Sequence, residues 1–173
     1  MKVDAEVIIA NISAVLSFIC ISVGISAKGK VKMMAFMTAN CGINVITNLL
    51  LRGWSGAVIQ TVNMIRNMIT AAGKMTKALS WIIMIVMALL GIAVNNQGIY
   101  GLLPLIASAE YTLSLSSENM LLLKTTLMIN MLLWSIYNFV IRNYVGGITS
   151  GFLAVQALVE MGKLIYTDKK GRV

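Results

Sequence analysis

Long apolar segments, separated by short polar connectors, follow one another along the whole chain. Each segment is about 20 residues long, and an apolar helix of that length crosses the roughly 30 Å of hydrocarbon in a bilayer. The pattern predicts seven membrane-spanning helices, over Val7–Ala27, Met33–Leu51, Trp54–Gly73, Leu79–Val94, Gly98–Leu115, Met120–Ile141 and Tyr144–Tyr166. The connectors at residues 52–53 and 142–143 barely allow the chain to reverse. The expected fold class is therefore an all-α integral membrane protein.

Residues 40–70 recur in altered form 90 positions later, as residues 130–160. In this register five pairs are identical, namely Asn40 and Asn130, Ile46 and Ile136, Asn48 and Asn138, Arg52 and Arg142, and Gly56 and Gly146. Trp54 becomes Tyr144, so an aromatic residue stands at both turns. An internal repeat of this length determines the architecture. The sequence leaves one alternative open, in which two amphipathic helical hairpins look alike without a common origin.

Seven spans with a 90-residue repeat divide into two three-helix repeats and one linker helix. The domains that we expect are residues 1–74, the linker at 75–97, and residues 98–173 with a short basic tail. Because one span separates the copies, both enter the membrane from the same side. The repeats are then parallel, related by an axis along the membrane normal, and in transporters built this way the substrate site lies near mid-membrane at the repeat interface.

Composition excludes most other classes of protein. The chain is 58% hydrophobic and 12% charged, with a mean hydropathy of +0.86, whereas soluble domains carry about 25% charged residues. Its net charge of +8 is not gathered on one face, so nucleic acid is not an expected partner. It has no histidine, and Cys20 and Cys41 both lie inside apolar segments. We therefore expect no metal site, no disulfide framework, no cofactor and no enzymatic activity.

The basic residues are unevenly divided between the two sides of the membrane in the seven-span arrangement. Ten lie on one side, three lie on the other, and Arg66 lies within a span. The ten are Lys28, Lys30, Lys32, Lys74, Lys77, Lys124, Lys163, Lys169, Lys170 and Arg172, and the three are Lys2, Arg52 and Arg142. Cytoplasmic connectors carry the excess of Lys and Arg, which predicts a cytoplasmic C-terminus and an N-terminus outside. The first apolar segment exceeds a signal-peptide core of about 7–15 residues, so we expect it to be retained as a span.

Several short motifs resemble those of a known family. They are Gly56-Ala57, Asn63-Met64-Ile65-Arg66 and Ile69-Thr70 in the third span, Leu102-Leu103-Pro104 in the fifth, and Trp134, Asn138 and Gly146-Gly147 around the sixth and seventh. With the 3+1+3 pattern they make the chain similar to the SWEET, PQ-loop and MtN3-like superfamily, and most of all to the bacterial inner-membrane YgjV family. The resemblance implies a SWEET-like fold in the bacterial inner (plasma) membrane. Unlike SWEETs, the chain has no Pro-Gln pair, and Pro104 is its only proline.

Amide side chains form stripes along the predicted spans. Asn40, Asn44 and Asn48 recur every four residues, and their copies are Asn130, Trp134 and Asn138; the third span has Gln60, Asn63 and Asn67, and the seventh has Ser150, Gln156 and Glu160. Such stripes are costly against lipid, so they face protein or a water-filled space. Either they bond neighbouring helices together, or they line a polar cavity between the repeats. The cavity interpretation gives the predicted substrate-binding residues as Asn44, Gln60, Asn63, Arg66, Asn67, Trp134, Ser150 and Gln156.

Arg66 is the most specific single residue in the pattern. It lies about 18 Å into the third span, where a charge costs at least roughly 2.5–3.5 kcal/mol on insertion scales. In one interpretation it pairs with Glu110 or Glu160 as a structural bridge or gate. In the other it binds an anionic group on a solute. The sequence favours the bridge, because two acids are available.

Two functional hypotheses follow. The first is a membrane transporter or facilitator that moves a small polar organic solute, anionic if Arg66 binds it, through a cavity between the repeats. The second is a receptor or interaction protein of the same fold that does not transport its ligand. The expected partners are the solute and the lipid bilayer, and a homo-oligomer remains open.

Overall fold

The computed structural model describes residues 5–170, with side chains for residues 5–166. These residues form seven α-helices and one short 3-10 helix. They are α1 (Ala5–Ser26), α2 (Lys30–Leu50), α3 (Trp54–Ala71), α4 (Lys77–Ala93), η1 (Gly98–Leu102), α5 (Leu103–Ser114), α6 (Met120–Val140) and α7 (Tyr144–Lys170). The all-α fold class is confirmed for this part of the chain. Lys2 and the basic tail (Lys169, Lys170 and Arg172) lie outside the residues whose side chains are described.

Six of the seven predicted spans match a helix to within four residues at each end. The fifth does not, because the segment Gly98–Leu115 was expected to be one continuous helix. Its first residues form the 3-10 helix η1, and α5 has only 12 residues. Pro104 lies in the first turn of α5, where its missing N–H leaves no hydrogen bond unmade, and Gly98 reaches a φ of 57°. This part of the prediction was wrong by about one and a half turns of helix.

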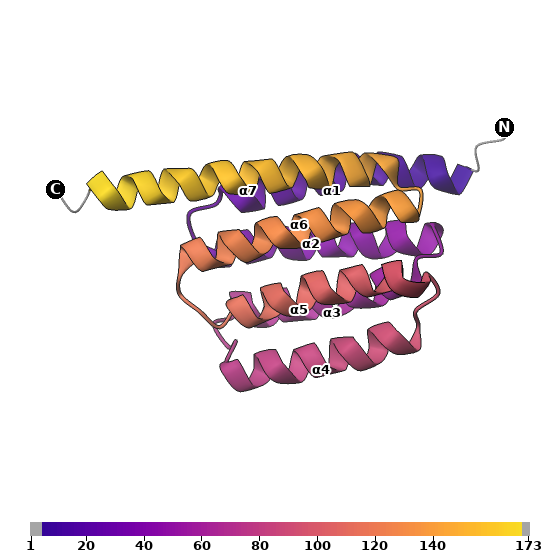
Figure 1. Cartoon of the computed structure of the whole chain (residues 1–173), viewed down its shortest axis with the longest axis horizontal. Coiled ribbons are helices and arrows are strands. Elements are labelled where there is room, and N and C mark those ends of the chain that lie inside the picture. The colour runs from indigo at the N-terminus through magenta and orange to yellow at the C-terminus, as the bar shows by residue number, and fades with distance from the viewer. Residues whose placement is uncertain (1–4, 171–173) are drawn as a thin grey trace.

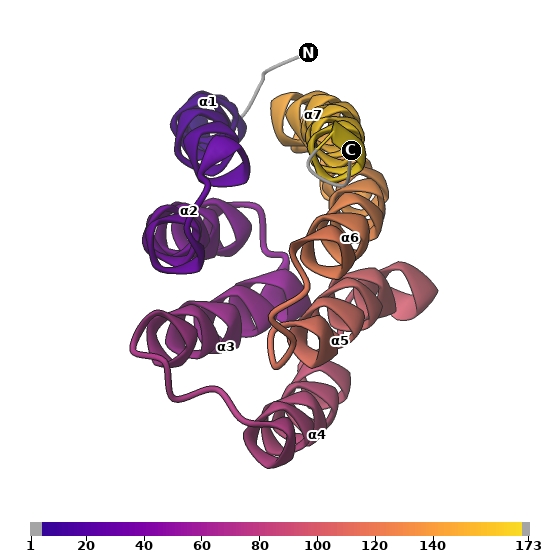
Figure 2. The same cartoon turned by 90° about the vertical axis from the view of Figure 1, so that its left-hand side faces the viewer.

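The helices lie side by side along a common direction (Figure 1). Seen along that direction, α1, α2 and α3 form one column and α7, α6 and α5 form a second, with α4 below both (Figure 2). Helices next to each other in sequence pack together, and α7 also packs against α1. At the opposite edge α3 contacts α5, and α4 packs against both. The chain therefore forms a closed ring of helices in which α2 and α6 face each other.

Apolar side chains occupy both the inside and the outside of this ring. Buried residues such as Met33, Met37, Leu127 and Tyr137 fill the interior, while the outer faces expose large aliphatic side chains from every α-helix. Within the described residues, α1, α2, α6 and α7 as far as Tyr166 are long and apolar enough to cross a membrane. The remaining three fall short, because α3 carries the polar stripe and α4 and α5 have only 17 and 12 residues.

The two tight turns of the proposed repeat have the same backbone geometry. Arg52 and Arg142, 90 positions apart, have φ values of 55° and 64° and are the non-glycine residues with positive φ in the described chain. After Arg52 the Gly53 N–H bonds to the Asn48 carbonyl at 2.8 Å, and after Arg142 the Asn143 N–H bonds to the Asn138 carbonyl at 2.9 Å. Each is the 6→1 bond that closes a helix in the Schellman manner. Each helical hairpin, α2–α3 and α6–α7, is thus closed by the same turn.

The helices that follow these turns are capped by different groups. The Gly146 N–H at the start of α7 is bound by the adjacent Asn143 side chain at 3.0 Å. Gly53 has no side chain to cap α3, and the Gly56 N–H instead donates to the hydroxyl of Tyr137, which belongs to the opposite column, at 3.2 Å. A Cβ on Gly56 would overlap the Asn48 side chain and lie 2.7 Å from the Tyr137 hydroxyl. The contact between the columns therefore requires glycine at position 56.

Gly56→Ala is expected to lower the free energy of unfolding by about 1–3 kcal/mol, because the added methyl group displaces Tyr137 and Asn48 in a packed region. Gly162→Ala in α7 is the matched control, since a Cβ there meets no atom within 4 Å. It should be neutral or stabilising by up to about 1 kcal/mol. Thermal unfolding of the purified proteins in detergent measures both. Equal melting temperatures for the two variants would contradict the packing described for Gly56.

Candidate functional site

A cavity lies inside the ring of helices and is lined by every α-helix except α4. Its free space is about 50 Å³, room for one or two water molecules at the roughly 30 Å³ that each occupies in the liquid. The structure brings seven of the eight predicted substrate-binding residues to its wall, namely Asn44, Gln60, Asn63, Arg66, Asn67, Trp134 and Ser150. A polar cavity between the columns was expected, and it is present. Binding by these residues stays a prediction.

Arg66 is buried in the wall of this cavity, with 3% of its surface exposed. Its Nε and Nη2 both donate to Asn67 Oδ1, at 3.2 and 2.9 Å. Its Nη1 donates to Thr112 Oγ1 at 2.9 Å and to the Ser108 carbonyl at 3.4 Å. The ring of Tyr111 covers the guanidinium, with its centroid 5.1 Å from Cζ. These groups hold the side chain in one orientation, and all of them are uncharged.

The predicted ion pair between Arg66 and an acid is not formed. No carboxylate among the side chains of residues 5–166 lies within ion-pair distance of the guanidinium. Glu110 is on α5 with Ser108 and Thr112, but two residues along a helix is a rotation of about 200°, so it points away from them. Glu160 pairs with Lys163, one turn along α7, at 2.7 Å. The buried charge of Arg66 therefore has no counter-ion among the described side chains.

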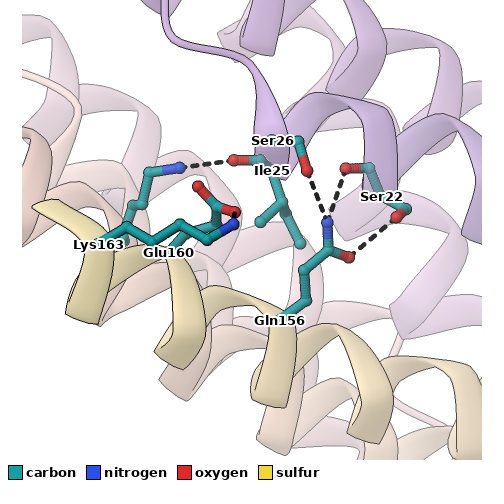
Figure 3. Close-up of polar contacts among 7 residues, drawn as sticks. Ser22, Ile25, Ser26, Gln156, Glu160 and Lys163 are labelled. Atoms are coloured by element: carbon teal, nitrogen blue, oxygen red, sulfur yellow. Dashed lines mark hydrogen bonds and ion pairs between the residues drawn. The ribbon is translucent and has the colours of Figure 1, made fainter.

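Gln156 is the predicted substrate-binding residue that does not line the cavity. Figure 3 shows its amide facing Ser22 and Ser26 of α1, with Glu160 and Lys163 beside each other on α7. Its Nε2 donates to the Ser22 carbonyl and to Ser26 Oγ, at 3.0 and 2.9 Å, and its Oε1 accepts from Ser22 Oγ at 2.9 Å. We expected the polar faces of α3 and α7 to meet, but α7 packs against α1 and α6. Gln156 therefore bonds two helices together and is not part of the cavity wall.

The amide stripe of α2 does both of the things expected of it. Ser17 of α1 donates to the side-chain oxygens of Asn40 and Asn44, which ties α1 to α2. In the other column Asn138 donates to Ser150 at 3.4 Å and accepts from Asn143 at 3.1 Å. The inner ends of these side chains still line the cavity. Interhelical bonding and cavity lining are thus properties of the same residues.

Some polar atoms in the cavity wall have no hydrogen-bond partner among the described residues. The side-chain oxygens of Asn48 and Asn63 are buried and accept no hydrogen bond. The amide of Gln60 and the indole N–H of Trp134 make no hydrogen bond within this part of the chain, although both side chains line the cavity. Buried polar groups in proteins are rarely left unpaired. The cavity therefore offers both donors and acceptors to an occupant.

Sequence reasoning missed several residues that shape the site. Ser108, Tyr111 and Thr112 of α5 supply the contacts to Arg66. The available signal was their spacing, since residues 108, 111 and 112 place three polar side chains on one face of a short span. Lys124 was counted among the basic residues of the cytoplasmic side, yet its side chain is buried in α6 with 3% of its surface exposed. Its Nζ donates to the Ile25 carbonyl in the last turn of α1, where a cation is favourable.

A bundle of apolar helices with a polar, charged centre is the architecture of a multi-pass membrane protein. The chain belongs to the Imp-YgjV family, described as bacterial inner membrane proteins, whose family model matches residues 8–167. This confirms the resemblance to the YgjV family and the assignment to the bacterial inner membrane. No curated protein matches the chain, and no solved structure does.

Substitution of two glutamines distinguishes a residue that bonds helices together, Gln156, from a residue that lines the cavity, Gln60. Gln156→Leu should lower the free energy of unfolding by about 1–3 kcal/mol, because Ser22 and Ser26 lose their partner and α1 separates more easily from α7. Gln60→Leu should leave it within about 0.5 kcal/mol, because no hydrogen bond is lost. Melting temperatures of the two variants in the same detergent test this. A larger loss for Gln60→Leu would contradict its assignment to the cavity.

Proposed function

We propose that this protein is a transporter or facilitator that moves a small anionic polar solute through the central cavity. One observation carries the proposal, the guanidinium of Arg66 buried in the cavity wall with neutral partners. Among the described side chains no acid compensates its charge. Burying an unpaired charge is strongly unfavourable. An anionic solute would supply the missing charge, and this supports the second interpretation of Arg66.

The hydrogen bonds of Arg66 leave one donor for such a solute. A guanidinium has five N–H groups, and four are engaged by Asn67, Ser108 and Thr112. The remaining N–H is on Nη2. The unpaired indole N–H of Trp134 and the amide of Gln60 add two more donors to the same cavity. Together they suit a small group that accepts hydrogen bonds and carries negative charge.

The size of the cavity limits the solute. Free space of about 50 Å³ favours a molecule of a few heavy atoms over one the size of a hexose. Polar contacts join the two columns near both ends of the bundle. Tyr137 binds α3 at one end, and Lys124 binds α1 at the other. Transport through this cavity would require the two sets of contacts to open in turn.

We further propose that all seven helices cross the membrane in a SWEET-like 3+1+3 arrangement. The matching turns at Arg52 and Arg142 support two repeats, with α4 as the linker. The ring order supports a parallel relation, since α1 stands diagonally opposite α5, α2 opposite α6, and α3 diagonally opposite α7 (Figure 2). A half turn about the bundle axis exchanges each pair, as parallel repeats require. Membership of the SWEET and PQ-loop superfamily belongs to this proposal.

The orientation can be tested with reporter fusions. Green fluorescent protein fused to the C-terminus should be fluorescent, because the excess of basic residues on that side predicts a cytoplasmic C-terminus. Alkaline phosphatase fused after Arg52 should be active, because it would lie outside. Fusion of the phosphatase after Lys74, on the opposite side, is the matched control and should be inactive. The reverse pattern would contradict an N-terminus outside the cell.

Flux into proteoliposomes tests transport directly. Vesicles containing the wild-type protein should swell faster than protein-free vesicles in an inward gradient of small potassium carboxylates, with valinomycin present so that K⁺ accompanies the anion. Arg66→Gln should reduce the protein-dependent rate about tenfold or more, because a charge-assisted hydrogen bond is lost. Arg142→Gln is the matched control, since Arg142 is exposed at a turn, and it should keep the wild-type rate.

The receptor hypothesis makes a different prediction for the same preparation. A receptor would bind the carboxylate with stabilisation of the fold but without flux. Binding lost in Arg66→Gln with no flux in either protein would therefore favour a receptor over a transporter. If the folded protein shows no binding and no flux with any small anion, the proposed role of Arg66 is overturned.

A further inference from the structure

The unpaired hydrogen-bond acceptors in the cavity wall, like its hydrogen-bond donors, restrict the chemistry of the solute that can bind. Asn63 and Asn48 line the cavity with 4% and 1% of their surface exposed, and the side-chain oxygen of each accepts no hydrogen bond from the described residues. A buried carbonyl oxygen without a donor is unfavourable. An occupant that carries only acceptors, such as a plain carboxylate, would leave both oxygens unpaired.

One of these oxygens belongs to a residue on the same face of α3 as Arg66. Asn63 and Arg66 are three residues apart on α3, which places their side chains on the same face. Both are bound to Ser108, since Asn63 Nδ2 donates to its hydroxyl at 2.9 Å and Arg66 Nη1 donates to its carbonyl at 3.4 Å. The residue that carries the cation and the residue that carries the unpaired acceptor are therefore both bound to a single residue of α5. A ligand that contacts both needs an anionic group and a hydrogen-bond donor on neighbouring atoms.

We propose that the solute is a small hydroxylated monoanion, a carboxylate that carries a hydroxyl group on the adjacent carbon. The carboxylate binds the free N–H of Arg66, and the hydroxyl donates to Asn63 Oδ1. The assignment rests on the proposed function, which it narrows to one chemical class. It also fits a cavity of about 50 Å³, since the shortest members of the class have only a few heavy atoms.

The charge balance distinguishes this class from its neighbours. One negative charge neutralises the single buried cation of the cavity wall. An amino acid supplies a donor as well, but its ammonium group would bring a second cation to a wall that holds no described carboxylate. A neutral polyol supplies donors without neutralising Arg66. A hydroxy acid meets both requirements with one molecule.

Binding of three molecules of similar size, two carboxylates added as sodium salts and one zwitterion, tests the proposal. Glycolate, acetate and glycine would be titrated into the purified full-length protein, with the melting temperature and the heat of binding as readouts. Glycolate should bind about tenfold or more tightly than acetate, which lacks only the hydroxyl. It should also bind more tightly than glycine, which replaces the hydroxyl with an ammonium group.

Two variants test whether Asn63 is the source of the preference for glycolate over acetate. Asn63→Leu removes the acceptor and should bind glycolate and acetate with equal affinity. Thr61→Val, on the exposed face of the same helix, should keep the wild-type preference. If Asn63→Leu does not fold, the comparison of glycolate with acetate in the wild-type protein decides alone.

The outcomes separate this inference from the proposed function. Equal binding of glycolate and acetate in the wild type, with both lost in Arg66→Gln, would overturn the hydroxyl assignment and leave anion transport standing. Tighter binding of glycine would overturn it in favour of an amino acid. Failure of the wild type to bind any anion would overturn both proposals.

Discussion

The structure depends on how one desolvated cation is accommodated. Arg66 lies inside a ring of apolar helices, and the groups around it are neutral amides, hydroxyls and a carbonyl. Each must point inward, so one face of α3 and one face of α5 are polar. Aromatic cover from Tyr111 completes the shell. The weak membrane signal of α3 and the polar face of the short α5 thus accompany the same buried charge.

Contacts between the two columns are polar at both ends and differ in kind. At one end a tyrosine hydroxyl replaces the missing cap of α3. At the other, a lysine and a glutamine bind backbone and side-chain oxygens of α1. Such bonds contribute little net free energy each, about 0.5–1.5 kcal/mol. They join the columns alongside the apolar side chains from both columns that pack together inside the ring.

The fold was largely predictable from sequence, and the cavity was predictable in part. Apolar segment length located the seven helices, and the 90-residue repeat located the two matching turns. Helical spacing placed seven polar residues in one cavity. Spacing gives depth and face along one helix but not which neighbour that face meets, and for this reason the Arg66 pairing with Glu110 or Glu160 and the position of Gln156 were wrong. The burial of Lys124 depends on the end of α1, which no local pattern encodes.

The two positive-φ turns have a consequence for motion. Each turn contains only a few residues. Its closing hydrogen bond joins a carbonyl in the last turn of one helix to the N–H of the residue just before the next helix. Such a connection has no slack, so α2 cannot slide or tilt far from α3, nor α6 from α7. The longer connectors at residues 72–76 and 115–119 lie on either side of the α4–α5 segment. Any rearrangement of this protein would therefore have to move the α2–α3 and α6–α7 hairpins as intact units.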